Sequence, residues 1–393
     1  MLARPRGRTG APRAALHLTL ILGGLVMSLR SVLVVPARRA ALAVSCAAAL
    51  ASSPLCAGCG AGERASSAGG SGALPDDTDV PGTETPTTPN APECPAAVSA
   101  RTTIENARGT LVGTLVVPAG CGPFPAVVII PGSGPTDRDG NQVAAGIEPD
   151  TYRLLAEGLR DRGIASIRYD KAGIGASVSA APRTEQEMLF EMGADDAGLW
   201  VKKLRADGRF ATITVVGHSE GSLLGMLVAR ETEIDGFVSI AGAGRPIGDV
   251  LRDQLERLPD EDRERANAIL DQLEAGELVT DIPQSQVFMS LFRPSVQPFV
   301  ISWMKHDPAV ELAAVTAPIL LLQGTTDLQT KVEDAERLAG ARPDATLVIV
   351  EGMSHTLKEA TLSNASQADA YTDPSLPVVP RVFEAIEALI REE

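Results

Sequence analysis

The chain has 393 residues, which is long enough for one large α/β domain with additional segments. Its formal net charge of −15 at pH 7 would repel phosphate backbones, which argues against nucleic acid as a partner. Only four histidines occur, and the five cysteines lack metal-site spacing, so the composition argues against a metalloenzyme and no metal or cofactor is expected.

Residues 1–58 are predicted to be an export signal. Two apolar stretches, 14–29 and 40–57, are separated by three arginines, and the second has a basic start, a short apolar run and small residues. Met27 is an alternative start that gives a more ordinary signal. The alternative is an unprocessed alanine-rich tail on a cytosolic enzyme.

The end of this segment resembles a bacterial lipoprotein cleavage box. Residues 55–59 read Leu-Cys-Ala-Gly-Cys, and cleavage after Gly58 would leave Cys59 to be lipidated, although the leucine lies four residues before the cysteine instead of three. Residues 59–96 follow as a flexible tether, because Gly, Ser, Pro, Thr and Asp dominate and almost no large apolar residues occur. We therefore expect an exported protein of the cell envelope, tethered to a bacterial membrane through Cys59.

Cys94 and Cys121 remain in the folded part of such an exported chain. In an oxidising compartment they are expected to form a disulfide that ties the start of the domain to its first strands. The alternative is a pair of free thiols, because sequence alone gives no geometry.

Residues 97–393 show strand patterns alternating with helical ones. Continuous apolar runs such as 126–130 are typical of buried parallel strands. The first strand, 110–117, is expected at an antiparallel edge. Further strands are expected at 164–169, 211–216, 236–241, 318–322 and 346–350, and helices at 151–162, 185–206, 220–230, 332–338 and 382–391. The alternation predicts an α/β fold, with a mostly parallel central sheet and helices on both faces.

Residues 245–316 interrupt this alternation and are predicted to form an inserted helical cap. Charged helical sequence at 249–273 is followed by an apolar stretch at 287–304. The apolar stretch is a candidate acyl pocket, although such a run also fits plain core. Its candidate pocket residues are Phe288, Leu291, Phe292, Phe299, Trp303 and Met304.

A nucleophile motif follows the strand at 211–216. Residues 217–221 read Gly-His-Ser-Glu-Gly and lead into a helix, which is the strand–turn–helix context that G-x-S-x-G requires. The motif alone is weak, since glycine-rich chains contain it by chance, but the context makes Ser219 the candidate nucleophile. The side chain of His218 is expected to point away from the serine.

A serine nucleophile needs a histidine base and a carboxylate that orients it. His355 lies in a loop after the strand at 346–350, and Asp327 follows the strand at 318–322, so the order Ser219, Asp327, His355 is the order of an α/β-hydrolase triad. Asp307 and Asp170 are alternatives for the acid. Asp170 precedes the nucleophile, so it is expected to hold loops by hydrogen bonds instead.

An oxyanion hole is expected beside Ser219. One donor is the backbone N–H of Glu220, directly after the nucleophile. The other is expected from the loop at 131–135, where Ser133 and Gly134 are both candidates that the sequence does not separate. The alternative is an ordinary Gly/Pro turn. Each such donor is typically worth about 10²–10³ in rate.

Four motifs together resemble the EstD-type bacterial esterases of the α/β-hydrolase superfamily, near the serine aminopeptidase-like hydrolases. They are Gly-Ser-Gly-Pro-Thr-Asp-Arg-Asp-Gly-Asn at 132–141, Arg-Tyr-Asp-Lys at 168–171, the motif at 217–221 and Asp-Leu-Gln at 327–329. The resemblance covers residues 100–391. It implies a serine carboxylesterase acting on short acyl chains without a cofactor, and the same triad roles for Ser219, Asp327 and His355. Asp137, Arg138 and Asp139 are expected to brace the oxyanion loop or the cap.

The chain departs from this family at two positions. Ala172 stands where many relatives have arginine, and Pro131 stands where many members of the broader fold have histidine. Neither departure touches the triad, but both bear on the mouth of the pocket.

The expected function is hydrolysis of a small-molecule carboxylic ester with a short to medium acyl chain. Fold and triad do not separate ester from amide or thioester cleavage, so a peptidase or thioesterase is the nearest alternative. A second alternative is a tethered envelope protein that binds ligands without catalysis, but no triad residue is missing. Nucleotide binding through Gly242-Ala243-Gly244 is discounted, because the third glycine of that motif is absent. The oligomeric state is not predicted.

Overall fold

The computed structural model describes residues 21–22, 25–26 and 94–392. Strands β1 (Ile21–Leu22) and β2 (Leu25–Val26) form a short antiparallel pair within the predicted export signal. The rest of that signal, the tether up to residue 93 and Cys59 lie outside the described residues. The remaining elements belong to the domain that starts at Cys94.

One eight-stranded sheet organises this domain, in the order β10-β9-β8-β7-β5-β6-β4-β3. All pairs from β10 to β6 are parallel, whereas β4 is antiparallel to both β6 and β3. The strands are β3 (Val98–Glu105), β4 (Thr110–Val117), β5 (Phe124–Ile130), β6 (Ala165–Tyr169), β7 (Phe210–His218), β8 (Gly236–Ile240), β9 (Ile319–Gly324) and β10 (Thr346–Val350).

Strand β4 was predicted as the edge of the sheet, and this is wrong, because β3 pairs along its whole outer side. Residues 98–105 escaped prediction because their side chains are mostly exposed and polar. An edge strand has one free side and needs no continuous apolar run, so its sequence carries a weak signal.

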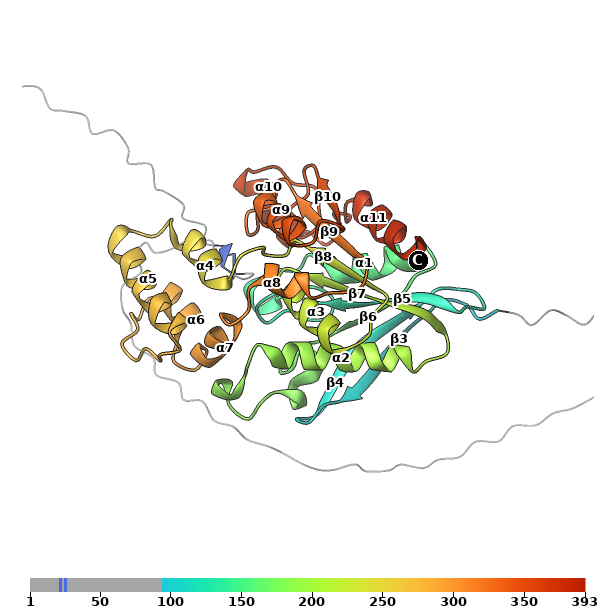
Figure 1. Ribbon diagram of the computed structural model, residues 1–393, viewed down its shortest axis with the longest axis horizontal. Coiled ribbons are helices and arrows are strands. Elements are labelled where there is room, and N and C mark those ends of the chain that lie inside the picture. Colours follow the sequence, from blue (N-terminus) through green and yellow to red (C-terminus); the bar gives the residue numbers. More distant parts are fainter. Residues whose placement is uncertain (1–20, 23–24, 27–93, 393) are drawn as a thin grey trace, which may run out of the picture. The chain divides into compact units, whose positions relative to one another are not determined.

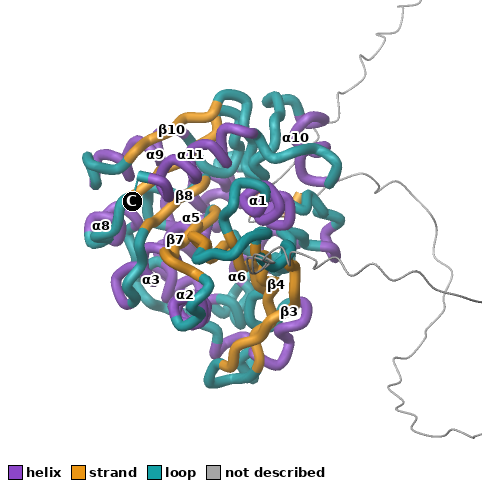
Figure 2. Tube along the Cα trace, turned by 90° about the vertical axis from the view of Figure 1, so that its right-hand side faces the viewer, coloured by secondary structure: helices purple, strands orange, loops and turns teal. Residues whose placement is uncertain are grey.

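Helices cover both faces of the sheet (Figures 1 and 2). Side chains alternate along each strand, so that Val128 and Ile130 point into one apolar core and Val127 and Ile129 into the other. The first core is closed by α2 (Glu191–Arg205), α3 (Glu220–Glu231) and α9 (Val332–Ala341), and the second by α1 (Thr151–Arg160) and α11 (Pro380–Arg391). The mostly parallel sheet with helices on both faces is therefore confirmed.

The helix predicted at 185–206 begins later than expected, at Glu191. Residues Glu185–Glu187 form the separate 3₁₀ turn η3, and Met188 is extended. A contact from another part of the chain accounts for the break, because the Phe190 N–H donates to the hydroxyl of Ser302 at 2.8 Å. The short elements η1 (Val143–Ala145), η2 (Gly175–Ala180) and α10 (Asn364–Thr372) lie in segments without a predicted element.

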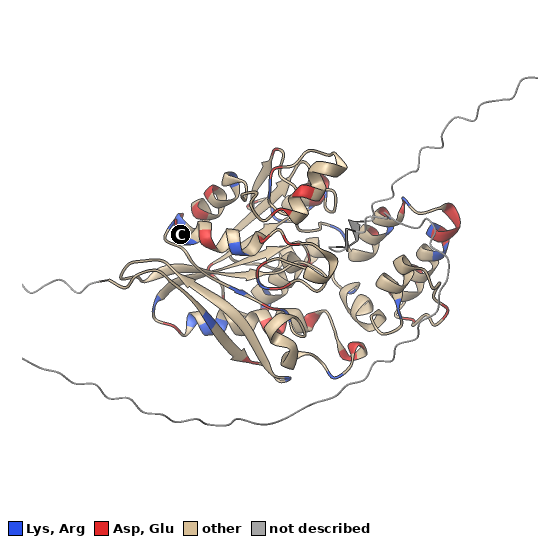
Figure 3. Cartoon of the chain, turned by 180° about the vertical axis from the view of Figure 1, so that it is seen from behind, with Lys and Arg blue, Asp and Glu red and all other residues tan. Residues whose placement is uncertain are grey.

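Four helices between β8 and β9 form the cap: α4 (Ile247–Leu255), α5 (Asp260–Glu274), α6 (Gln286–Phe292) and α7 (Gln297–Trp303). They share their own apolar core, which includes Leu255, Ile269 and Phe288. A fifth helix, α8 (Pro308–Ala313), also lies within residues 245–316, but its Leu312 is buried in the core of the main domain. Figure 3 shows acidic and basic residues distributed along the chain of the domain, and the first turn of α5 carries three acidic residues.

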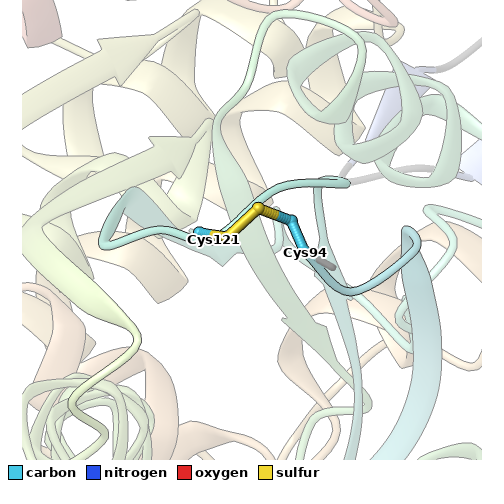
Figure 4. Close-up of a disulfide and its surroundings, with 2 residues drawn as sticks. All are labelled: Cys94 and Cys121. Carbon is cyan, nitrogen blue, oxygen red and sulfur yellow. A yellow bond between two sulfur atoms is a disulfide. The ribbon is translucent and has the colours of Figure 1, made fainter. Parts of the chain in front are cut away.

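A disulfide joins Cys94 to Cys121, with the two Cα atoms 4.7 Å apart (Figure 4). Cys94 lies just before β3 and Cys121 just after β4, so the bond closes the open end of this hairpin. Among the described residues, none of the helices has both the length and the apolar character needed to cross a membrane.

Candidate active site

Ser219 lies in the sharp turn between β7 and α3. Its backbone has φ 54° and ψ −119°, a region that residues with a side chain seldom adopt. Two neighbouring glycines make the turn possible, because a Cβ on Gly221 would lie 2.3 Å from the Ile130 carbonyl oxygen and a Cβ on Gly217 would lie 2.2 Å from the Gly221 carbonyl oxygen. The turn therefore holds the serine side chain clear of its own strand and helix.

The candidate acid and base meet in the loops after β9 and β10. Asp327 Oδ2 lies 2.8 Å from His355 Nδ1, and both residues are buried. Burial raises the pKa of Asp327, but His355 and the N–H groups of Gln329 and Thr330 outweigh this effect and lower it. The carboxylate therefore stays ionised, accepts the Nδ1–H of His355 and leaves Nε2 available as a base.

His218 links the serine turn to the histidine loop. Its Nε2 lies 2.8 Å from the His355 carbonyl oxygen, and the two imidazole ring centres are 4.8 Å apart. The His218 side chain thus turns away from the cavity that Ser219 faces. No hydrogen bond between Ser219 Oγ and His355 Nε2 occurs among the described residues, and in enzymes without bound substrate this contact is often long.

The two candidate catalytic side chains face adjoining cavities. Ser219 lines a large cavity of about 550 Å³, and His355 lines a small one of about 50 Å³. Ser133 and Gln329 border both cavities, so the two cavities adjoin at these residues.

The candidate oxyanion loop follows β5 and lies against the nucleophile. A Cβ on Gly132 would lie 3.3 Å from Ser219 Cβ, which shows how closely the loop backbone approaches the serine. Ser133, Gly134 and Glu220 line the same cavity as Ser219. The three candidate donor residues and the nucleophile therefore line the same cavity.

The carboxylates of Asp137, Asp139 and Asp170 hold the segment that follows this loop. Asp137 Oδ1 accepts the N–H groups of Asp139 and Asn141, both at 2.9 Å, and Asp139 pairs with Arg168. Asp170 accepts the N–H of Arg138 at 2.9 Å and that of Ala176 at 2.8 Å. These contacts fix residues 137–141 and tie them to the segment around Asp170, but none of them reaches residues 131–135 or the cap, where the bracing role was expected.

Neither alternative acid binds His355. Asp170 is engaged with the loop backbone, and Asp307 caps α8 by accepting the N–H of Ala309. His306, another described histidine, lies between Glu311 and Glu191 at 2.9 and 3.2 Å. Within the described ranges no cluster of three or more His, Cys, Asp or Glu side chains is arranged to hold a metal ion.

Three of the six predicted pocket residues, Leu291, Phe299 and Trp303, line the large cavity. The other three do not: Phe288 and Phe292 are 1% exposed in the cap's own core, and Met304 packs against that core. The physical reason is that α6 has apolar surroundings on two sides, the cavity and the core of the cap. It turns its phenylalanines towards the other cap helices.

The sequence did not predict a second set of apolar residues that line the cavity. This set comes from the segment before α2, where Met188, Leu189 and Phe190 line the cavity. The Phe190 ring stacks on Trp303 with ring centres 5.0 Å apart, so the main domain and the cap share this lining. The predicted helix at 185–206 hid this segment, because its apolar residues fit a helix face equally well.

Charged side chains that line the large cavity are all paired. Arg108 pairs with Asp196, Lys171 with Glu220, Arg293 with Glu185, and Arg245 with Asp334 behind the wall. The cavity therefore presents mainly apolar surface with locally balanced charge, which suits an uncharged ligand group.

Comparison with known proteins agrees with the fold. Residues 127–372 match the model of the alpha/beta hydrolase family, which is more than half of the chain. The chain belongs to the alpha/beta hydrolase family.

Among characterised proteins, the chain is 30% identical over 256 residues to Esterase EstD of Thermotoga maritima. The match covers 63% of this chain and 58% of that protein, so the chain spans less than two thirds of its relative's length.

Solved structures show the same fold at low sequence identity. GrgF, an alpha/beta hydrolase from Penicillium, has a TM-score of 0.51 at 14% identity and covers 75% of this chain and 98% of its own. A hypothetical protein from Pseudomonas aeruginosa also has a TM-score of 0.51, at 16% identity, with 77% and 95% covered.

Proposed function

We propose that the protein hydrolyses carboxylic esters, with Ser219 as nucleophile, His355 as base and Asp327 as the residue that orients the base. The observation that carries this proposal is the buried Asp327–His355 hydrogen bond of 2.8 Å beside the constrained turn of Ser219. The similarity to Esterase EstD supports ester cleavage over amide cleavage.

In the proposed mechanism, Ser219 Oγ attacks the ester carbonyl carbon while His355 Nε2 takes the hydroxyl proton. The carbonyl oxygen becomes an oxyanion that accepts hydrogen bonds from the N–H of Glu220 and from an N–H of the loop at 131–135. Collapse of this intermediate breaks the bond to the alcohol, which leaves with the proton from His355. A water that His355 activates then hydrolyses the acyl-enzyme, which releases the acid and restores Ser219.

Hydrolysis of p-nitrophenyl acetate, butyrate and octanoate by the full chain tests this proposal, beside Ser219→Ala. We expect kcat to fall by at least about 10³-fold in the variant, because the nucleophile is lost. Ser99→Ala, on the exposed face of β3, is the control and should retain full activity. Substantial activity in Ser219→Ala would contradict the proposal, and a folded but inactive wild type would direct the assay to peptide and thioester substrates.

We further propose that the large cavity holds the acyl chain and accepts short to medium lengths. Trp303 closes part of this cavity, so Trp303→Ala should enlarge it and raise the ratio of kcat/KM for octanoate over acetate severalfold. Leu278→Ala, at an exposed leucine of the cap segment, should leave the ratio unchanged. Equal losses on both esters in Trp303→Ala would show that the indole does not contact the chain.

We also propose that the protein is exported and tethered through a lipid on Cys59. The disulfide between Cys94 and Cys121 supports an oxidising compartment. When the protein is expressed in a bacterium that is supplied with labelled palmitate, the wild type should carry the label. Cys59→Ser should carry no label and should be recovered in the soluble fraction. Equal labelling and equal membrane recovery of both proteins would contradict the tether.

A further inference from the structure

We propose that Lys171 is a positioning residue for the oxyanion hole. It holds in place the two peptide groups whose N–H groups would bind the oxyanion. This inference rests on the proposed ester hydrolysis. Lys171 is the second residue after β6 and lies in neither of the two loops that carry the candidate donors. Its ammonium group reaches both of them and so joins three separate segments of the chain.

The first contact orients the N–H of Ser133. Lys171 Nζ donates to the Gly132 carbonyl oxygen at 2.9 Å. In a planar trans peptide, this carbonyl and the N–H of Ser133 point in opposite directions, so fixing one fixes the other. Gly132 lies against Ser219, and Ser133 is its direct neighbour in the chain, whereas Gly134 is one residue further from this close approach. The contact therefore favours Ser133 as the loop donor.

The second contact fixes the other donor residue. Lys171 Nζ also donates to Glu220 Oε1 at 3.0 Å, and the Glu220 side chain is only 5% exposed. Glu220 is the first residue of α3, where backbone N–H groups have no partner within the helix. Because its side chain is tied to Lys171, the start of the helix is held at a set distance from the oxyanion loop.

Tyr152 holds Gly132 from the opposite side. Its hydroxyl oxygen accepts the Gly132 N–H at 2.8 Å and lies 2.8 Å from His218 Nδ1. His218 in turn contacts the His355 carbonyl oxygen through Nε2. Both polar groups of Gly132 are thus occupied, and the loop is connected to the serine turn and to the histidine loop. A backbone held on both sides is preorganised, which is what charge stabilisation in a transition state requires.

A direct role of Lys171 in binding an anionic substrate fits the structure less well. The ammonium group already donates two hydrogen bonds, and the buried carboxylate of Glu220 balances its charge. Its side chain is 22% exposed, so only part of it faces the cavity. A positioning role uses the observed contacts without any rearrangement.

The experiment compares full-length wild type, Lys171→Met and Lys171→Gln on p-nitrophenyl butyrate. Methionine has a similar length but no donor, so we expect kcat to fall about 10- to 100-fold at nearly unchanged KM, a fraction of the loss seen when a donor is removed. The affinity for a trifluoromethyl ketone, which forms an oxyanion on Ser219, should weaken by a similar factor. Lys331→Met, at a lysine paired with Asp253, is the matched control and should keep wild-type values.

A wild-type kcat in folded Lys171→Met would overturn the inference, as would a raised KM at unchanged kcat, which indicates substrate binding. Should Lys171→Met not fold, Lys171→Gln keeps a donor for Gly132 but no cation for Glu220 and must still lower kcat. If the wild type cleaves no ester, the proposed function fails by itself. In that case the rate at which a fluorophosphonate labels Ser219 tests the role of Lys171. We expect slower labelling of Lys171→Met than of the wild type. Equal rates, or no labelling of either protein, would overturn the inference.

Discussion

His218 illustrates how a residue inside the nucleophile motif supports the site without facing the substrate. It lies between Tyr152 and the backbone of His355, and its ring is almost fully buried. Burial, with a smaller effect from His355, lowers the pKa of His218 to about 3. The ring is therefore neutral at ordinary pH, so that it donates Nε2–H to the carbonyl oxygen and accepts the Tyr152 hydroxyl proton at Nδ1.

This neutral histidine makes the folded state sensitive to acid. In the unfolded chain the ring has its ordinary pKa near 6.5, so between about pH 6.5 and 3 the unfolded state binds one more proton than the folded state. The free energy of unfolding should therefore fall as the pH falls through this window, by about 2 kcal/mol between pH 6.5 and 5 from this group alone.

Urea unfolding of wild type and His218→Gln at pH 7 and pH 5 measures this contribution. Glutamine keeps one donor and one acceptor but does not titrate, so the variant should lose less free energy of unfolding between the two pH values. The same pH dependence in both proteins would show that His218 does not supply it.

At the scale of elements, the serine turn depends on how closely α3 approaches the end of β5. Gly221→Ala would place a Cβ 2.3 Å from the Ile130 carbonyl oxygen and 2.7 Å from that of Pro131, and both are backbone atoms. The helix would have to move away from the strand, so we expect about 2–3 kcal/mol of destabilisation and a lowered kcat.

Gly208→Ala is the matched control, because nothing lies within 4 Å of the added methyl group. It should change the free energy of unfolding by less than about 0.5 kcal/mol. Urea unfolding of both variants makes the comparison. Equal stability of Gly221→Ala and wild type would mean that the helix start is free to shift.

The elements also show where sequence patterns are ambiguous. The apolar residues at 188–190 fit a helix face, yet in the structure they leave the helix and form a wall of the cavity. Phe288 and Phe292 fit a pocket equally well, yet they fill the core of the cap. An apolar side chain has the same pattern in both places, because only the neighbouring segments decide which surface covers it.

At the scale of the whole molecule, the disulfide secures the edge of the sheet. Cys94 and Cys121 are 27 residues apart and close the hairpin of β3 and β4, which ends the sheet. Replacing both with serine should lower the free energy of unfolding by about 3 kcal/mol, since the unfolded chain gains freedom. Urea unfolding compares the double variant with oxidised and reduced wild type, and reduced wild type should match the variant. No difference among the three would show that the pairing of β3 suffices without the bond.

Much of the site could be derived from the order of residues along the chain. Parallel strands end at one edge of a sheet, so the loops that follow β7, β9 and β10 lie at the same edge. The nucleophile motif and the chain order of the triad predicted Ser219, Asp327 and His355 in these loops, and in the structure Asp327 and His355 are in contact.

The tertiary structure alone decided which side chains surround and support these residues. Lys171, Tyr152 and His218 come from segments far apart in sequence and meet around Gly132 and His355, and no local pattern marks such contacts. The division of the apolar cap residues between core and cavity depends in the same way on the packing of α6 and α7. The sequence by itself determined the fold class and the candidate chemistry, because the alternation of strand and helix patterns and the spacing within motifs are local. Long-range packing decided the shape of the cavity and the support of the site.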